Sequence, residues 1–445
     1  MNLRHTAFVL SLGILTLGIS CGPPEKKVSE MRLPNMERLF NFYGEKQASG
    51  ALKILADSLK NANEDLQSSE LFVQAAYVYW EGGETDSTAA MLHKAIDNGM
   101  SNPRILDKFP RRNNAIEGAG WDALQDRLDS IDRELKELSH FELRTEAMDV
   151  FWPYLNRALE DTSQARVQLK TFILTGPPEV RDFYVVRYGS IDQMYGQIIN
   201  AAPQYYKYLQ GQFNPDSVNL VKETIVGSMT RFREIYPQAV FPKVYIVPGI
   251  LNSGGTATEM GMFLGGDMYG KSPEMPTQEL TEWQRDAIMN FSDLPRLTIH
   301  ELMHFQQNYQ DEEHRETLLS AIIHEGVCDF MVELCSGEVL VNDNLEFLSN
   351  ADNEKWIFEE LAAELLEEDT SKWLYNGGSI EDRPADLGYT MGYLITKSYY
   401  EQHLDKKQAV YDLLNANDLT EIVKNSSYAY LLEGAKPENS KPLTL

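Results

Sequence analysis

The chain has few cysteines and far fewer basic than acidic side chains. Its 445 residues include three cysteines, 40 Lys and Arg, and 67 Asp and Glu, with a formal net charge of −27 at pH 7. Nucleic-acid affinity comes largely from Lys and Arg at phosphates, so no nucleic-acid partner is expected. Cys328 and Cys335 lie about 10 Å apart along one predicted helix, too far to bridge. Disulfides are therefore not expected to hold this fold.

Long apolar runs are also scarce, and the one at the N-terminus is too short for a bilayer-spanning helix. Ala7 to Ile19 follows the basic Arg4, as in a secretory signal. Small residues then precede Cys21, which predicts a lipoprotein signal over residues 1–21 with Cys21 as the lipidated N-terminus. An ordinary cleaved signal with an incidental cysteine is the alternative. Loss of residues 1–20 would remove Arg4 and take the net charge to −28.

The residue after Cys21 bears on location. Gly22, rather than Asp, resembles outer-membrane sorting. We therefore expect a protein of the bacterial cell envelope, an outer-membrane lipoprotein on the periplasmic face or the surface. Its membrane contact would be the N-terminal lipid anchor alone.

The N-terminal third of the chain is predicted to be helical. Residues 22–35 are rich in Pro, Glu, Lys and Ser and are expected to form a flexible tether. Within residues 36–139, Glu70 to Trp80 and Asp86 to Asn98 resemble a tetratricopeptide hairpin. The full period of about 34 residues does not repeat, so the array is degenerate, with one or two hairpins. Such a domain serves either as a helical spacer or as a groove for a protein partner.

The remainder, residues 140–434, is predicted as a second domain, and residues 435–445 as a disordered tail. Val167 to Leu174 alternates like a strand, and Lys243 to Pro248 is a strand by its β-branched and aromatic content. Asn252 to Thr256 is expected to be a flexible turn. With a second short strand after it, the fold class is mainly α with a small β-sheet (α+β).

The clearest motif is the H-E-x-x-H pentapeptide that begins at His300 and ends at His304. Residues four apart lie on one side of a helix, so these two histidines can place their imidazole nitrogens on one ion. Glu301 comes beside the metal rather than on it, where a general base for metal-activated water belongs. The alternative is a pair of hydrogen-bonded core histidines.

A second predicted helix, Thr317 to Cys335, offers the third ligand that catalytic zinc usually has. Glu325 is a suitable carboxylate, and Asp329, one turn later, could accept the second N–H of a ligand imidazole. Gly326 is costly inside a helix and fits a close approach of two helix backbones. His324 is a rival ligand, although adjacent helix positions point about 100° apart. One Zn²⁺ per chain is the expected cofactor, with manganese or iron as alternatives.

Three segments carry a resemblance to a known family. H-E-L-M-H-F-Q-Q, I-H-E-G-V-C-D-F and G-Y-T-M-G-Y resemble predicted zinc-dependent proteases of the gluzincin clan, and more closely a family of zincin-like bacterial lipoproteins. The resemblance covers roughly residues 141–402 and implies a zincin-type metallopeptidase domain. It implies ligands His300, His304 and Glu325, the base Glu301, and Asp329 behind a ligand histidine. Cys328 departs from the pattern, which has a small residue, often Ala, near this position.

Zincins also carry a small sheet over the metal, and its edge strand pairs with an extended peptide. We assign that substrate-binding edge to a short strand that precedes the pentapeptide. Its residues are Gly261, Met262, Phe263, Leu264 and Gly265. The alternative is a structural hairpin of the core. Asp267 to Leu280 is expected to be a loop at the rim of the cleft.

A gluzincin further needs a hydrogen-bond donor for the oxyanion, often Tyr or His and sometimes helped by Arg. Tyr389 and Tyr393 lie four apart on one face of a helix predicted to end near Gln402. They are the first and second candidates, and Arg383 is the third. The alternative is a Tyr-rich helix that packs behind the site.

Together these features predict a zinc-dependent peptidase, anchored in the bacterial cell envelope, that acts on a peptide or protein substrate. A catalytically silent zincin-fold lipoprotein, which binds a partner through its helical domain, is the alternative. An intact ligand set with Glu301 favours the enzyme, because a scaffold has no need of a general base.

Overall fold

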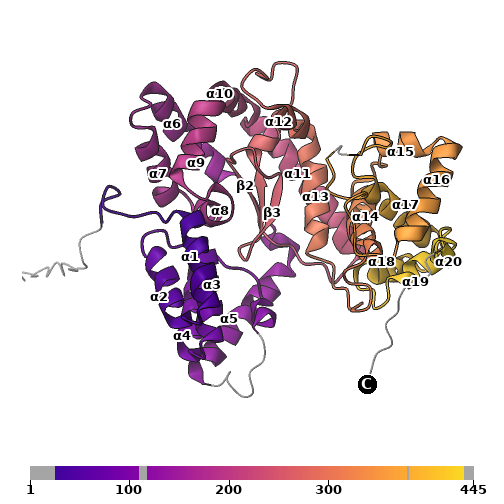
Figure 1. The fold of residues 1–445 in the computed structure, drawn as a ribbon, viewed down its shortest axis with the longest axis horizontal. Helices are drawn as coiled ribbons and strands as arrows, with labels where there is room; N and C mark the ends of the chain where they lie inside the picture. The colour runs from indigo at the N-terminus through magenta and orange to yellow at the C-terminus, as the bar shows by residue number, and fades with distance from the viewer. Residues whose placement is uncertain (1–25, 110–117, 378–379, 435–445) are drawn as a thin grey trace, which may run out of the picture.

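The structure, a computed structural model, is mainly helical with one small sheet (Figure 1). It describes residues 26–109, 118–377 and 380–434. The predicted fold class is therefore confirmed. The predicted signal with Cys21 and the predicted tail lie outside the described residues. Among those residues, no helix combines the length and the apolarity that a bilayer span requires.

The N-terminal helices form one group, drawn in indigo and purple in Figure 1. They are α1 (Met36–Ala48), α2 (Leu52–Ala62), α3 (Ser69–Glu81), α4 (Thr85–Asp97) and α5 (Ala119–Leu135). Helix α3 is central, and it packs against both α2 and α4. Its Trp80 ring meets Trp121 of α5 edge to face, with 5.9 Å between the ring centroids. The two helices predicted as a hairpin are present as α3 and α4, while the tetratricopeptide resemblance itself stays a prediction.

A second group of helices follows. It comprises α6 (Glu146–Glu160), α7 (Ala165–Thr175), α8 (Pro178–Phe183), α9 (Ile191–Met194), α10 (Pro203–Gln212) and α11 (Pro215–Ile235), with π-helical turns at Tyr184–Tyr188 and Tyr195–Ala201. The strand predicted at Val167 to Leu174 is wrong, because this segment belongs to α7. Leu169, Phe172 and Ile173 are fully buried, whereas Val167 is half exposed. Residues with this spacing lie on one face of a helix, so burial of that face favours a helix more than the β-branched residues favour a strand.

A buried carboxylate joins the two groups of helices. Asp182 of α8 accepts hydrogen bonds from the Ser69 backbone N–H, at 2.7 Å, and from the Ser68 hydroxyl, at 2.6 Å. Both donors stand at the start of α3, where backbone N–H groups lack partners within the helix. Burial raises the pKa of Asp182 to about 6. The first turn of α3 is thus capped from a helix more than a hundred residues away in sequence.

The sheet lies at the centre of the molecule (Figure 1) and has the strand order β1-β2-β4-β3. Its strands are β1 (Leu143–Arg144), β2 (Val244–Val247), β3 (Gly255–Ala257) and β4 (Met262–Gly265). Strand β2 runs parallel to β1 and β4, and β3 runs antiparallel to β4.

This order corrects the assignment of the substrate-binding edge. Residues Gly261 to Gly265 lie in or next to β4, which has a neighbour on both sides and is buried throughout, so they cannot be the edge. The edge strand next to β4 is β3, most of which was predicted as the turn Asn252 to Thr256, and the other edge strand is β1. An inner strand needs apolar residues on both faces, which made β4 conspicuous, while small residues gave β3 little strand signal.

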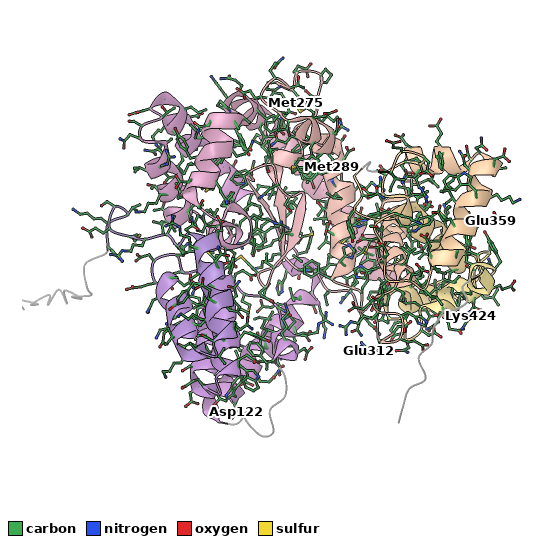
Figure 2. The ribbon with its side chains drawn as sticks, in the orientation of Figure 1. Asp122, Met275, Met289, Glu312, Glu359 and Lys424 are labelled. Atoms are coloured by element: carbon green, nitrogen blue, oxygen red, sulfur yellow. The ribbon has the colours of Figure 1, made fainter. Side chains whose placement is uncertain are left out.

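The C-terminal half surrounds the motif-bearing helices. These are α13 (Leu294–His304) and α14 (Leu318–Ser336), and the others are α12 (Glu282–Ala287), α15 (Asp343–Leu348), α16 (Ala351–Glu364), α17 (Leu387–Gln402), α18 (Lys406–Leu414), α19 (Thr420–Lys424) and α20 (Leu431–Gly434). Helix α13 stands between the sheet and the orange and yellow helices (Figure 1). Charged side chains such as Asp122, Glu359 and Lys424 point away from the body (Figure 2).

Helices α14 and α17 cross with their backbones in close contact. A Cβ atom on Gly326 would lie 2.0 Å from the carbonyl carbon of Gly392, and one on Gly392 would lie 1.8 Å from the Ile322 carbonyl oxygen. The Thr396 hydroxyl also donates to the Gly326 carbonyl at 3.2 Å. The close approach predicted for Gly326 is present, but its partner is α17 rather than the helix that carries the pentapeptide.

We therefore expect Gly326→Ala to lower the free energy of unfolding by at least about 2 kcal/mol, because two packed helices would have to separate. Thermal or denaturant unfolding of the purified protein measures this change. Gly227→Ala is the matched control, since Gly227 lies inside α11 with nothing within 4 Å of an added Cβ. Equal stabilities of the two variants would contradict the close crossing.

Candidate metal centre

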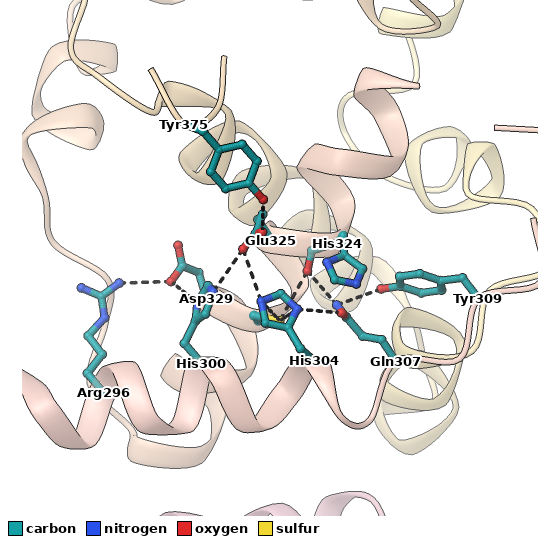
Figure 3. A network of polar contacts seen from close by, with 10 residues as sticks. Arg296, His300, His304, Gln307, Tyr309, His324, Glu325, Asp329 and Tyr375 are labelled. Atoms are coloured by element: carbon teal, nitrogen blue, oxygen red, sulfur yellow. Dashed lines mark hydrogen bonds and ion pairs between the residues drawn. The ribbon is translucent and has the colours of Figure 1, made fainter. Parts of the chain in front are cut away.

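The pentapeptide lies on α13 with its two histidines directed toward α14, as predicted (Figure 3). Both imidazoles meet the same carboxylate oxygen. His300 Nε2 lies 3.2 Å and His304 Nε2 lies 3.5 Å from Glu325 Oε2. Residues that are about 20 positions apart in sequence thus present three donor atoms at one point.

The two histidine–carboxylate spacings fit a zinc ion. Around these helices, the described donor sets that lie within 4.8 Å of one another are His300, His304 and Cys328, and His304, His324 and Glu325. Zinc takes His nitrogen and carboxylate oxygen at about 2.0–2.2 Å in a tetrahedral arrangement, which sets neighbouring donor atoms about 3.3–3.5 Å apart. The two histidine–carboxylate distances are close to that separation. Two neutral imidazoles and one carboxylate also form a donor set that catalytic zinc sites use.

Charge is concentrated in this cluster. His300 is 6% exposed and Glu325 is 6% exposed. Burial alone would lower the pKa of His300, but hydrogen bonds to Asp329 and Glu325 outweigh burial and raise it to about 9. Burial opposes ionisation of Glu325, yet its hydrogen bonds with His300 and His304 hold its pKa well below the usual range. Without a metal, His300 is therefore protonated at pH 7 and balances one carboxylate, and a metal ion would take the place of that proton.

Asp329 stands behind the first histidine, as predicted. Its Oδ1 lies 3.1 Å from His300 Nδ1 and 3.3 Å from Arg296 Nη2. A carboxylate at Nδ1 favours the tautomer that carries its proton there and leaves Nε2 free as a ligand. Arg296 in turn holds Asp329 in place.

Gln307 plays the corresponding part for the second histidine, and the sequence analysis did not identify it. Its Oε1 lies 3.0 Å from His304 Nδ1, and its Nε2 donates to the His324 carbonyl oxygen at 2.7 Å. The first contact orients the ring, and the second ties Gln307 to α14 (Figure 3). Gln307 belongs to the H-E-L-M-H-F-Q-Q segment, but only the fold brings α14 to its amide.

Two neighbours of His304 are rival donors. The His324 ring stacks on His304 with 4.6 Å between centroids, and donor atoms of His304, His324 and Glu325 lie within 4.8 Å of one another. Burial and His304 lower the pKa of His324 to about 4, so its imidazole is neutral at pH 7. Cys328 Sγ lies 3.4 Å from His304 Nδ1, and burial raises the pKa of its thiol well above the usual value. A bound metal would deprotonate this thiol, and donor atoms of His300, His304 and Cys328 lie within 4.8 Å of one another, so Cys328 is a rival for the third ligand position.

The carboxylate of Glu301 lies against strand β3 of the sheet. A Cβ atom on Gly255 of β3 would lie 3.2 Å from both Glu301 Oε1 and Cδ. A side chain at position 255 would make this contact tight, and the Glu301 carboxylate would have to shift by a few tenths of an ångström. Glu301, which follows the first histidine in the chain, therefore has its carboxylate against the edge strand.

Of the two predicted tyrosines, only Tyr389 lies beside the histidine cluster. The Tyr389 ring lies 6.2 Å from the His300 ring, so the first candidate borders the cluster. Tyr375, which the sequence analysis did not single out, donates its hydroxyl to Glu325 Oε1 at 2.7 Å (Figure 3). It stands in an irregular segment with a φ of +58°, a conformation that non-glycine residues adopt rarely and often at functional sites. The positive φ of Tyr375 is a property of the folded backbone, so the sequence alone does not reveal it.

Tyr393 and Arg383 are not brought to the cluster. The Tyr393 hydroxyl bonds Glu333 and Lys397. Arg383 donates to Glu360 Oε2 at 2.7 Å and is stacked between two indole rings, each 5.0 Å away. In this structure their side chains therefore contact residues outside the histidine cluster, and the oxyanion role given to them stays a prediction. Helical spacing put Tyr393 on the face of Tyr389, but the next turn of α17 carries it past the cluster.

We expect Asp329→Asn to weaken zinc binding by about 10- to 100-fold, because His300 loses the carboxylate that sets its tautomer. Competition with a chelator of known affinity measures this change. Asp412→Asn is the matched control, since Asp412 also accepts a side-chain hydrogen bond, from Tyr399 at 3.0 Å, but outside the cluster. Unchanged zinc affinity in Asp329→Asn would contradict the role given to this carboxylate.

Comparison with known proteins agrees with the chemistry of this cluster. Residues 279–421 match the model of a family described as predicted Zn-dependent protease (DUF2268). The matched residues include both histidines, Glu301, Glu325 and Tyr389. No curated protein and no solved structure matches the chain. Over residues 279–421, the chain is therefore similar to predicted zinc-dependent proteases.

Proposed function

We propose that this protein is a zinc-dependent peptidase that hydrolyses peptide bonds in a peptide or protein substrate. The observation that carries the proposal is the convergence of His300 and His304 on one oxygen of Glu325, with Glu301 on the same helix and against the edge strand. A binding protein would have use for a metal, but not for a carboxylate held beside it. The family match over residues 279–421 supports the same reaction class.

The residues divide the work as follows. His300, His304 and Glu325 would hold the ion, which when bound supplies a water of lowered pKa and polarises the substrate carbonyl. Glu301 takes the proton from the attacking water and returns it to the leaving amine. Asp329 and Gln307 keep the two imidazoles in the tautomer and orientation that ligation needs.

Tyr389 and Tyr375 are the candidates to donate a hydrogen bond to the developing oxyanion. Their rings lie 6.2 Å apart at the rim of the cluster. Burial is the main reason that the pKa of each phenol lies well above its ordinary value, so both hydroxyls keep their protons at neutral pH. A protonated phenol at this place strengthens its hydrogen bond as negative charge forms on the substrate oxygen.

The free edge of β3 is the proposed seat of the substrate backbone. Strand β3 pairs with β4 on one side only, and Glu301 lies against its first residue, Gly255. An extended peptide could add to this edge through main-chain hydrogen bonds, which tolerate many sequences. The peptide bond above Glu301 would then be the one that is cleaved.

Glu301→Gln should keep the metal and lose peptidase turnover by at least about 100-fold, because the amide cannot accept the proton. Turnover of a peptide library, read by mass spectrometry, and metal content per chain are the two measurements. Glu359→Gln, at an exposed site on α16, is the matched control. Undiminished turnover in Glu301→Gln would exclude this mechanism.

Metal content tests the ligand set directly. Purified protein starting after Cys21 should contain one zinc per chain, and Glu325→Ala should lose it or bind it at least about 100-fold more weakly, because one of three ligands is gone. Elemental mass spectrometry after dialysis against zinc gives both values. A parent protein that takes up no zinc would rule out the proposed centre.

We further propose that the peptidase is held in the bacterial cell envelope by lipid on Cys21. The expected result is that mass spectrometry of the N-terminal peptide finds acyl chains on this cysteine and that Cys21→Ser moves the protein from the membrane fraction to the soluble fraction. Cys335→Ser serves as the control, since Cys335 is buried in α14. Membrane association that persists in Cys21→Ser would refute the lipid anchor.

A further inference from the structure

A cavity of about 660 Å³ lies at the end of the edge strand. On one side it is lined by the turn that follows β3, at Thr258 and Glu259, and on another by Phe305 and Gln306, which come directly after His304. The N-terminal helical group supplies a further wall, with residues 101–104 and the end of α5. The cavity therefore adjoins both the substrate edge and the metal-bearing helix.

The distance along β3 relates this cavity to the reaction. Gly255 lies against Glu301, and Thr258 at the cavity comes three residues later. Three residues of strand span about 10 Å. A peptide extended along β3, with its scissile bond over Glu301, would carry a residue about three positions away into the cavity.

The wall from the N-terminal helices is held firmly to the turn. The Ser101 backbone N–H donates to the Glu259 carbonyl at 2.7 Å, and the Ser101 hydroxyl donates to the Met260 carbonyl at 2.6 Å. On the opposite side, the Phe241 N–H donates to the Leu135 carbonyl of α5 at 2.7 Å. The helical group thus forms part of the same wall as the sheet, and it shapes this end of the cleft.

Charge in the cavity has the opposite sign to that of the whole chain. Its two acidic side chains are already neutralised, Glu259 by Lys108 and Asp132 by Lys136. Its two arginines, Arg104 and Arg233, have no carboxylate within ion-pair distance among the described residues. Arg233 is instead fixed by donation to the Ala239 carbonyl, at 3.2 Å. Two uncompensated positive charges therefore line a hollow in a protein of net charge −27.

We propose that this cavity binds a carboxylate of the substrate and makes the enzyme selective for acidic peptides. The carboxylate belongs to an Asp or Glu side chain about three residues from the cleaved bond, or to a peptide terminus that reaches the same place. Guanidinium groups suit this task, because they bind carboxylates through paired hydrogen bonds. The inference rests on the proposed peptidase function, and it gives the N-terminal helical group a part in specificity.

The test compares peptides that differ only in having Glu, Gln or Lys at positions two to four residues on either side of the cleaved bond. For the parent enzyme, kcat/KM should be at least 10-fold higher for the best Glu peptide than for its Gln analogue, which is about 1.4 kcal/mol. Arg104→Gln combined with Arg233→Gln should lower kcat/KM for the Glu peptide to that of the Gln peptide, which removes the preference. Arg166→Gln is the control, since Arg166 lies on α7 outside the cavity.

Two additional comparisons identify the source of the carboxylate and provide a second variant. Short peptides with a free or an amidated C-terminus distinguish a terminal carboxylate from a side chain. Arg104→Gln alone, which replaces an exposed side chain, replaces the double variant if that protein does not fold. Equal rates on the Glu and Gln peptides in the parent, or a preference that survives in the variants, would overturn the proposal.

A binding experiment separates this proposal from the peptidase itself. Fluorescence anisotropy with the Glu301→Gln protein reports affinity for the same peptides without turnover. Tighter binding of the Glu peptide, lost in the arginine variants, supports the cavity even if no peptide is cleaved by the parent, in which case only the peptidase proposal fails. No difference in affinity between the Glu and Gln peptides contradicts the carboxylate site.

Discussion

The charge of one buried carboxylate organises this structure. Glu325 lies in the interior of α14, where an uncompensated negative charge would cost several kcal/mol. The imidazoles of His300 and His304 contact one oxygen of Glu325, and the Tyr375 hydroxyl donates a hydrogen bond to the other. Asp329 and Glu325 raise the pKa of His300, and a divalent cation bound at Glu325 would take the place of the proton that His300 then holds.

The surrounding packing serves to hold that carboxylate in place. Next to Glu325, Gly326 lets α14 lie directly on α17, so the helix that carries the carboxylate has little freedom to shift. Asp329 and Gln307 hold the two imidazoles from behind. In the edge strand β3, Gly255 has no side chain and so leaves room for the Glu301 carboxylate. Three separate parts of the chain thus meet at one set of donor atoms.

Local sequence was enough for the helices and for the pentapeptide. The helix that carries the pentapeptide and the helix predicted from Thr317 to Cys335 are present as α13 and α14, because residue spacing within each segment is enough to indicate a helix. Prediction failed where a segment's state depends on its neighbours. Residues 167–174 form a helix because one face of that helix packs into the core. Strand β4 is an inner strand because β3 pairs with it.

What the sequence determined by itself was the chemistry available: two histidines and a glutamate at helical spacing, a second helix with Glu325 and Asp329, and an acidic chain with little cysteine. Those follow from residue type and from distances of one helical turn. Only the tertiary structure decided that Tyr375 and Gln307 join the cluster, that Tyr393 and Arg383 do not, and that two arginines line a hollow beside the edge strand. Such contacts join residues far apart in the chain, and their geometry is set by how helices cross and strands pair.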